Sequence, residues 1–287
     1  MALAFALLLA VQPARAQPDP LRPALWKLTD ADTTIYLFGT VHMLPPGAAW
    51  LQGPVAAALD ASDQLVTEVT DPTGTATQAA VARRALLPRG RSLRTTLPAP
   101  TRAAYEALLR RIALPVDSFD RNKPWFAAVA LASVPLMRRG YAPANGVEAA
   151  LDARPAARAR TRGGLETADG QLALLDRLPR AVQVRYLAGV VADYDRIDPE
   201  VDAMARAWGR GDADELARLM NEDEGKDDPM LTQVLITRRN RAWAGWIARR
   251  MGQPGTVFLA VGAGHLAGPG SVQDLLARRG LKAERVQ

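Results

Sequence analysis

The two histidines of this chain occur in matching surroundings. In each case an apolar run, typical of a buried strand, ends in the motif Gly-x-x-His, from Gly39 to His42 and from Gly262 to His265. We expect the glycine to let the backbone turn sharply, so that each imidazole lies at the carboxyl end of a strand. Because α/β sheets bind ligands at that edge, the two motifs predict two halves of one site.

A metal centre is the first chemistry that these residues suggest. Imidazole and carboxylate ligands suit zinc, manganese, iron and cobalt, and two histidines with one or two carboxylates form many catalytic metal sites. Glu68 is the best carboxylate, because it lies near the end of the next expected strand and could face the same crevice as His42. A purely structural role for both histidines remains about equally favoured by the pattern alone.

Four further polar residues could belong to such a site. Glu166 follows two glycines and could act as a base or a ligand, but composition alone favours a carboxylate that stabilises a helix amino terminus. Glu148 is a similar case. Arg239 and Asn240 could bind a carboxylate or an oxyanion, although an ordinary surface helix turn is the favoured interpretation. The common serine-hydrolase and zincin motifs are absent from the sequence.

The elements that would position these residues alternate between strands and helices near the ends of the chain. Residues 25–28 and 33–38 predict a hairpin that turns at residues 30–32. A helix at 54–61 and a strand at 64–69 then predict a parallel β-α-β unit.

Helical periodicity dominates the middle of the chain, from about residue 76 to residue 250. The expected helices are at 100–112, 124–139, 147–153, 170–177, 181–193, 199–208, 212–220 and 231–251. A short strand at 161–165 and an acidic loop at 221–228 interrupt them, and a strand at 256–261, a helix at 270–279 and a strand at 281–286 close the chain. We therefore predict an α/β fold with a mixed sheet core, paired strand–G-x-x-H motifs and a large helical insertion.

Composition narrows the class of protein. A hydrophobic content of 48% indicates a folded globular chain, and the absence of cysteine excludes disulfides and thiolate chemistry. The net charge of +6 comes from scattered arginines, and aromatic residues make up only 6%, so we expect a solvated basic surface and no nucleic-acid partner.

The first residues resemble an export signal. An apolar run is followed by an A-x-A pattern at Ala14 and Ala16, which predicts a signal peptide over 1–16 and a periplasmic or secreted protein. A flexible leader over 17–23 and a single domain over 24–287 would follow. The apolar stretch at 125–137 is too short to span a bilayer and contains Pro135, so we expect no stable membrane span after signal cleavage. The sequence makes no prediction of the oligomeric state.

Short motifs spread over nearly all of the chain after the leader resemble the TraB/GumN family, which is related to the Tiki metalloproteases. The matching pieces are Leu25-Trp26-Lys27, Gly39-Thr40-Val41-His42, Glu68, Lys123-Pro124-Trp125, Gly140-Tyr141, Gly146-Val147-Glu148, Gly163-Gly164-Leu165-Glu166-Thr167, Gln171, Arg239-Asn240, Trp243 and Val261-Gly262-Ala263-Gly264-His265-Leu266 with Gly268. One departure is Glu148, where the family usually has aspartate.

The resemblance implies a metal-dependent peptidase site made of His42, His265 and Glu68, with manganese or cobalt as the divalent metal ion and zinc as an alternative. Glu166 matches the G-L-E motif of the family, and Arg239 with Asn240 matches its R-N motif. The implied substrate is a peptide or a protein.

The leading hypothesis is therefore an exported metal-dependent hydrolase that cleaves peptide bonds. His42 and His265 would hold the metal, and Glu68 would be a third ligand or the base that activates water. Arg239 or Asn240 would steady the oxyanion or a substrate carboxylate. Two alternatives remain open: a metal-free hydrolase with a histidine general base oriented by a glutamate, and a protein that binds a peptide or an envelope component without turnover.

Overall fold

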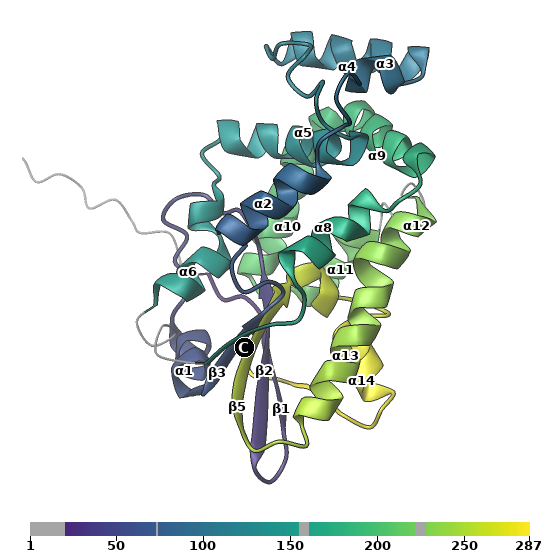
Figure 1. Ribbon diagram of the computed structural model, residues 1–287. Coiled ribbons are helices and arrows are strands. Elements are labelled where there is room, and N and C mark those ends of the chain that lie inside the picture. Colours follow the sequence, from purple (N-terminus) through teal and green to yellow (C-terminus); the bar gives the residue numbers. More distant parts are fainter. Residues whose placement is uncertain (1–20, 73, 155–160, 222–227) are drawn as a thin grey trace, which may run out of the picture.

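A mixed six-stranded sheet lies at the centre of the computed structural model, which describes residues 21–72, 74–154, 161–221 and 228–287 (Figure 1). The strand order is β4-β3-β5-β2-β1-β6. Helices cover both faces of the sheet, and a further group of helices lies beyond the carboxyl ends of its parallel strands. The predicted α/β class is therefore confirmed.

The expected hairpin is present at the start of the described chain. β1 (Leu25–Thr29) pairs antiparallel with β2 (Thr33–Thr40). Asp30 closes the turn, because its carboxylate accepts a hydrogen bond from the backbone N–H of Thr33 at 2.8 Å. Short polar residues such as aspartate favour tight turns through this kind of local bond.

The parallel part of the sheet joins segments that are far apart in the sequence. After α1 (Gly53–Ala61), β3 (Gln64–Thr67) runs parallel to β2, as the predicted β-α-β unit requires. The two strands are not neighbours, however, because β5 (Gly255–Gly262) lies between them and pairs with both. β4 (Thr161–Gly164) completes this side by pairing with β3.

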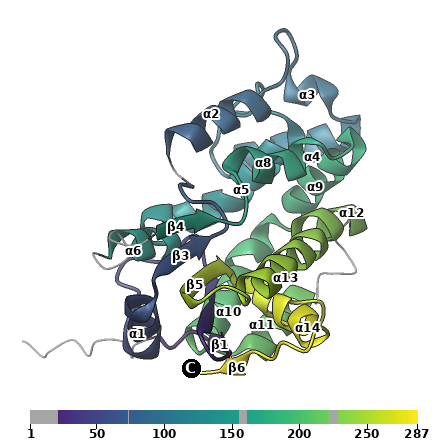
Figure 2. The same cartoon turned by 60° about the horizontal axis from the view of Figure 1, so that its bottom comes forward.

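Side chains of the strands alternate between two hydrophobic cores, as period-2 geometry demands. Phe258 belongs to the core on one face, which α1, α6 (Val147–Ala153) and α10 (Ile197–Gly209) cover. Its neighbour Leu259 belongs to the opposite core, which is covered by α13 (Arg238–Arg250) and α14 (Val272–Ala277). Figure 2 shows α1 and α6 on one side of the strands and α13 and α14 on the other.

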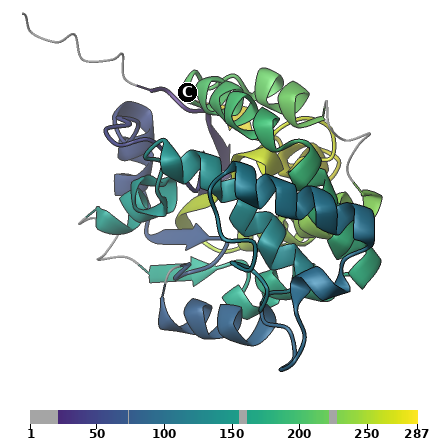
Figure 3. The ribbon, with the colours of Figure 1, turned by 90° about the horizontal axis from the view of Figure 1, so that it is seen from above.

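A separate hydrophobic core holds together the helical layer above the sheet, which we call the helical cap (Figure 3). Its helices are α3 (Leu93–Thr96), α4 (Ala99–Arg111), α5 (Pro124–Arg138) and α9 (Arg180–Ala192). Tyr105, Leu109 and Leu131 are fully buried in this core. Only part of the helical insertion expected from the sequence therefore packs as a unit of its own, because α6, α10 and α13 cover the faces of the sheet.

The remaining helices confirm most of the expected periodicity. They are α2 (Thr75–Arg84), η1 (Pro143–Asn145), α8 (Ala168–Asp176), η2 (Tyr194–Arg196), α11 (Ala213–Asn221), α12 (Pro229–Thr232) and η4 (Ala263–Leu266). The single helix expected at 231–251 is interrupted by a π-helical segment, η3 (Gln233–Thr237). The last strand is also shorter than expected: the Leu281 N–H closes the end of α14, and only β6 (Glu284–Arg285) pairs with β1.

Several predictions fall on residues that the structure does not describe. The signal peptide, residues 17–20 of the leader and most of the acidic loop lie outside the described ranges. At the end of the expected leader, the N–H groups of Leu21 and Arg22 donate to the carbonyls of Ala49 and Gly209. Within the described residues, none of the helices combines the length and apolar character that a membrane crossing requires.

Candidate functional site

Four polar residues converge at one edge of the sheet. Glu166, Glu68, His265 and His42 each follow, within three residues, the carboxyl ends of β4, β3, β5 and β2. These strands are adjacent and parallel in that order, so segments far apart in the sequence present their side chains side by side. We call these four residues the strand-end cluster, and its position is the edge at which open α/β sheets bind ligands.

The glycines of the two G-x-x-H motifs serve close packing. Neither Gly39 nor Gly262 has a positive φ angle, but the chain does turn at Gly262, where β5 ends and the 3-10 helix η4 begins. A Cβ at Gly39 would lie 3.0 Å from the Cα of Ala263, and one at Gly262 would lie 3.1 Å from Glu68 Oε1. The absence of a side chain therefore lets the ends of β2 and β5 approach each other and lets Glu68 reach the backbone of β5.

Asn240 determines the protonation of His265. The Asn240 amide donates through Nδ2 to the Gly270 carbonyl at 2.8 Å, which leaves Oδ1 to accept from His265 Nδ1 at 2.6 Å. Nδ1 therefore carries the proton, and Nε2 offers its lone pair to the site. Burial and the nearby charge of Arg239 lower the pKa of His265 to about 4. His265 is thus a neutral imidazole at physiological pH.

Glu68 is a buried carboxylate with three hydrogen-bond donors. Its Oε1 accepts from the N–H of Gly262 at 2.7 Å, and its Oε2 accepts from Gln171 Nε2 at 2.8 Å and from Arg239 at 2.5 Å. Burial acts to raise the pKa of Glu68, but the charge of Arg239 and the bond from Gly262 outweigh it and hold the pKa below its usual value. Glu68 is therefore ionised at the edge of the sheet.

Arg239 lies inside the cluster and not on a surface turn. Its side chain is only 10% exposed, and its guanidinium binds Glu68, both oxygens of Glu166 and His265 Nε2. The Trp243 ring lies 4.6 Å from the guanidinium carbon, in a cation–π contact. Asn240 is likewise buried, so the interpretation of both residues as a surface turn was wrong. Their contacts are tertiary, and helical periodicity alone could not reveal them.

Glu166 also differs from the interpretation that composition favoured. Glu166 precedes α8, but its carboxylate is bound by Arg239 at 2.8 Å, so its main contact is with the site and not with the helix terminus. Gln171, on the first turns of α8, donates to Glu68 at 2.8 Å and to Glu166 at 3.3 Å. The motif resemblance included Gln171, but nothing in the residue itself indicated that it links two carboxylates.

His42 has the opposite environment to His265. Its side chain is 70% exposed, and its Nδ1 lies 2.8 Å from Glu148, whose side chain is 17% exposed. The hydrogen bond to Glu148 raises the pKa of His42 above its usual value, although partial burial opposes it. In turn, His42 lowers the pKa of Glu148 against the effect of burial. The longer acid at this position therefore reaches and orients the first histidine.

The exposed side of the site opens into a cleft of about 340 Å³. Its lining includes His42, Glu68, Glu148, Asp152 and Gln171. A cleft of this size admits a short segment of a larger substrate, with the exposed imidazole and an ionised carboxylate facing it.

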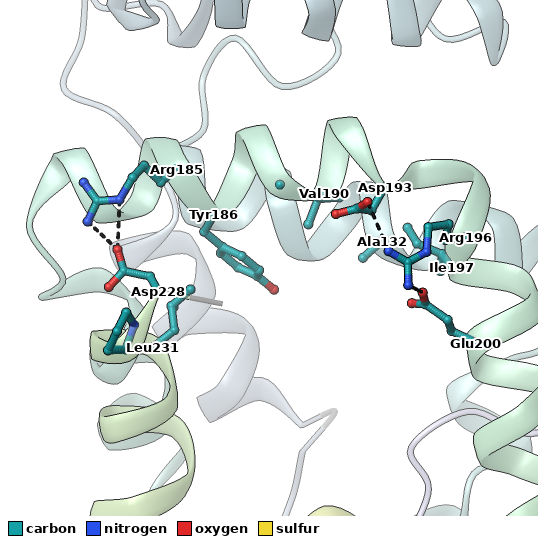
Figure 4. Close-up of a pocket in the computed structure, with 12 residues that line it drawn as sticks. Ala132, Arg185, Tyr186, Val190, Asp193, Arg196, Ile197, Glu200, Asp228 and Leu231 are labelled. Carbon is teal, nitrogen blue, oxygen red and sulfur yellow. Dashed lines mark hydrogen bonds and ion pairs between the residues drawn. The ribbon is translucent and has the colours of Figure 1, made fainter. Parts of the chain in front are cut away.

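A larger hollow of about 520 Å³ lies between α9, α10 and the start of α12 (Figure 4). None of the strand-end cluster lines it. Its charged residues pair with one another, Arg185 with Asp228 and Arg196 with Glu200. It therefore offers no concentration of unpaired charge or of reactive groups.

The donor set at the sheet edge suits a divalent cation. It combines two imidazoles with ionised carboxylates, and His265 Nε2 lies 4.0 Å from Glu68 Oε1. Across the described ranges, however, no three histidine or acidic side chains form a preassembled metal site. Arg239 makes contact with both His265 and Glu68.

Comparisons with known proteins agree with the motifs. The sequence model of the TraB/PrgY/gumN family matches residues 24–285. The chain is also similar to an uncharacterized protein of Treponema pallidum (strain Nichols), with 23% identity over 270 residues that cover 89% of this chain and 80% of the relative. No solved structure matches the chain.

Proposed function

Because the chain belongs to the TraB/PrgY/gumN family, we propose that it is a metal-dependent hydrolase whose site is the strand-end cluster. His42, His265 and Glu68 would hold the cation. The proposed substrate class is a peptide or a protein, on the basis of the resemblance to Tiki-type peptidases. The cation is manganese or cobalt, with zinc as the alternative.

The observation that carries the proposal is the state of His265 beside Glu68. Asn240 holds the imidazole in the tautomer whose lone pair is on Nε2, the atom to which Arg239 donates, and a neutral imidazole beside an ionised carboxylate is the state that a metal ligand set requires. When bound, a divalent cation polarises a carbonyl and lowers the pKa of water toward neutrality.

The chain's own residues would divide the remaining tasks. Asn240 keeps His265 in position, and Glu148 orients His42 at the mouth of the cleft. Glu68 would be the third ligand or would accept a proton from water. Arg239, held by Glu166, supplies the positive charge nearest to these groups and would steady a substrate carboxylate or an oxyanion.

Elemental analysis tests the proposal directly. The chain would be purified from Gln17 onward, as wild type and as His42→Ala, His265→Ala and Glu68→Gln, and each protein would be reloaded with manganese, cobalt or zinc. We expect near-stoichiometric metal in the wild type and a loss of at least half of it in each variant. Glu106→Gln, on α4 in the helical cap, serves as the matched control and should retain its metal. Absence of metal from every reloaded preparation would exclude the proposed ligand set.

Turnover is tested separately, with a peptide library and detection of new amino termini. Cleavage that requires the added metal and is lost in His265→Ala supports a metallohydrolase. Stoichiometric capture of peptides without any product would instead support a binding protein.

The pair of His42 and Glu148 supports a second candidate, metal-free hydrolysis. A carboxylate 2.8 Å from Nδ1 orients an exposed imidazole as a general base facing the cleft. Under this candidate, turnover resists chelators and falls by about 10²-fold or more in His42→Ala. Complete loss of turnover on chelation, with recovery on addition of metal, would exclude it.

We also propose that the protein is exported. The apolar run over residues 1–11, followed by the small residues Ala14 and Ala16, supports this localisation. Expression of the full chain should yield a mature protein that begins at Gln17, as measured by intact mass and amino-terminal sequencing of the exported fraction. An uncleaved chain in the cytoplasm would contradict export.

A further inference from the structure

The Arg239 guanidinium has no unused hydrogen-bond donor. Its Nε donates to Glu166, one terminal nitrogen donates to the Leu235 carbonyl at 3.1 Å and to His265 Nε2 at 3.0 Å, and the other donates to Glu68 and to Glu166. These bonds engage all five N–H groups of the side chain. The ring of Trp243 covers one face of the group. Arg239 is therefore held firmly at the centre of the cluster.

Two of these bonds use the atoms that a metal ion would need. Because His265 Nδ1 donates to Asn240, the Nε2 lone pair is the free one, and Arg239 occupies it. At Glu68, Gln171 and Arg239 together occupy both acceptor positions of Oε2, so a cation that binds through this oxygen must displace the guanidinium. A nitrogen lone pair cannot serve a guanidinium N–H and a cation at the same time.

The charges also disfavour binding of Arg239 and a divalent cation to the cluster at the same time. Without Arg239, the buried carboxylate of Glu68 and the carboxylate of Glu166, whose side chain is 17% exposed, would lie uncompensated at the same edge of the sheet, and such a pair is costly unless a cation compensates it. Arg239 supplies one positive charge to both. A divalent cation would supply two, and its addition beside a retained guanidinium would place like charges in contact.

We infer that Arg239 is a built-in cation that competes with a divalent metal ion for His265 and Glu68. This inference rests on the metal site of the proposed function. The guanidinium neutralises the cluster while metal is absent, and metal binding requires it to release His265 and Glu68. The hydrogen bond from Arg239 Nε to Glu166 and the contact of Arg239 with Trp243 do not involve His265 or Glu68. Weakly binding cations therefore fail to enter, since they cannot offset the loss of these charged hydrogen bonds.

Metal affinity in Arg239 variants tests the competition. Zinc and manganese binding to the chain from Gln17 onward would be measured by calorimetry for the wild type, Arg239→Met and Arg239→Lys. We expect Arg239→Met to bind zinc about tenfold more tightly or better, because charged hydrogen bonds no longer have to be broken. Arg239→Lys keeps the charge but has fewer donors, so its affinity should fall between the two. Arg94→Met removes another carboxylate-bound arginine, remote from the site, and should match the wild type.

A measurement on the unmodified side chain covers the case in which Arg239→Met fails to fold. Trp243 lies 4.6 Å from the guanidinium and 4.4 Å from the His265 ring, so saturation with zinc should change its fluorescence, seen as the difference from Trp243→Phe. Zinc binding to the wild type without this change overturns the inference. So does zinc affinity in Arg239→Met that is equal to or weaker than that of the wild type.

The two failures are distinguishable. If the wild type binds zinc through His265 and Glu68 but Arg239→Met gains nothing, the competition is refuted and the metallohydrolase stands. If no variant binds zinc or manganese, Arg239→Met included, the proposed ligand set is refuted, and the competition with it.

Discussion

The two histidines illustrate how single hydrogen bonds divide one residue type into two functions. His265 is buried and faces an amide oxygen, which forces a proton onto Nδ1 but offers no negative charge to stabilise an imidazolium. His42 is exposed and faces a carboxylate, which stabilises the charged ring. At the same edge of the sheet, one imidazole is therefore neutral and offers a lone pair, and the other holds its proton more strongly than a free imidazole does.

Nuclear magnetic resonance of the imidazole rings tests this division, since the sequence contains only two histidines. We expect His265 to titrate near pH 4 with its proton on Nδ1, and His42 to titrate above its usual value of about 6.5. In Glu148→Gln the charge that faces His42 is gone, so the pKa of His42 should fall while that of His265 stays unchanged. Two rings that both titrate near 6.5 in the wild type would contradict the assignment.

Acid stability should depend on His265. The unfolded chain protonates this ring at about pH 6.5 and the folded chain at about pH 4, so between these values the unfolded state binds more protons. Stability should therefore fall as the pH falls through this window. Urea unfolding at pH 7, 5.5 and 4.5 measures the slope for the wild type and for His265→Gln.

The expected outcome for His265→Gln is a shallower slope in that window. His42→Gln is the comparison, because the raised pKa of His42 contributes stability at low pH that is lost as the pH rises through its folded value. The stability that His42→Gln loses on acidification should therefore be no smaller than the loss in the wild type. Equal slopes for the wild type and His265→Gln would show that this ring does not couple folding to pH.

Among the elements, the ends of β2 and β5 depend on their glycines for contact. Gly39 packs against the backbone of η4, the turn that carries His265. Backbone cannot move aside as a flexible side chain can, so an added methyl group must separate the two strand ends. The relation of His42 to His265 is therefore determined by backbone packing as much as by the side chains themselves.

Substitution of glycine by alanine measures this constraint. We expect Gly39→Ala to lower the free energy of unfolding by ~1–3 kcal/mol, the usual cost of overpacking. Gly189→Ala is the control, because Gly189 lies within α9 with no atom near an added Cβ, and alanine is the better helix former. Denaturant unfolding should show a lower free energy of unfolding for Gly39→Ala and no decrease for Gly189→Ala. Equal stability of both variants would contradict the packing argument.

Sequence patterns predicted those elements whose own residues carry the signal. The hairpin, α1 and β5 follow from local periodicity and turn residues, and the Gly-x-x-His motifs correctly indicated that His42 and His265 lie at one edge. Patterns failed where the decisive contact is tertiary. The insertion of β5 between β2 and β3 depends on strand pairing, which leaves no trace in the periodicity of either strand.

The same limit applies to the site. Arg239 and Asn240 occupy helical positions that look like any other polar pair, and only the packing of α13 against the sheet turns them inward. The π-helical segment η3 precedes them, and its Leu235 carbonyl accepts a hydrogen bond from Arg239. The residues of η3 have no sequence signature of a π turn. The prediction that Arg239 and Asn240 belong to the site therefore depended on the family motif and not on physical reasoning about the residues.

At the scale of the whole molecule, the helical cap and the sheet have separate cores. Leu131 is fully buried among the helices of the cap, and Leu259 is buried beneath α13 in the sheet core. A charged pair joins the cap to α8, where Lys123 at the start of α5 binds Asp176, and Gln171 of the same helix donates to Glu68 at the sheet edge. Two cores joined by a partly polar interface can open independently of each other.

Hydrogen exchange tests this independence. Leu131→Ala should cost ~2–5 kcal/mol of local stability and should reduce the protection of amides in α5 and α9 while those of β5 stay protected. Leu259→Ala is the matched change in the sheet core, and it should reduce protection in β5. If Leu131→Ala reduced the protection of β5 as much as that of α5, cap and sheet would form one cooperative unit.

The position of β5 has a consequence for the order in which the chain matures. β2 and β3 lie near the amino terminus, but the strand between them begins at Gly255. Until residues 255–265 are available for folding, β2 and β3 lack the strand that lies between them and the cluster lacks its second histidine. The sheet closes and the cluster assembles in a single late event, so an incomplete chain has no working site and two edges that invite wrong pairing. The strand order therefore makes activity depend on the carboxyl-terminal part of the chain, which contains β5.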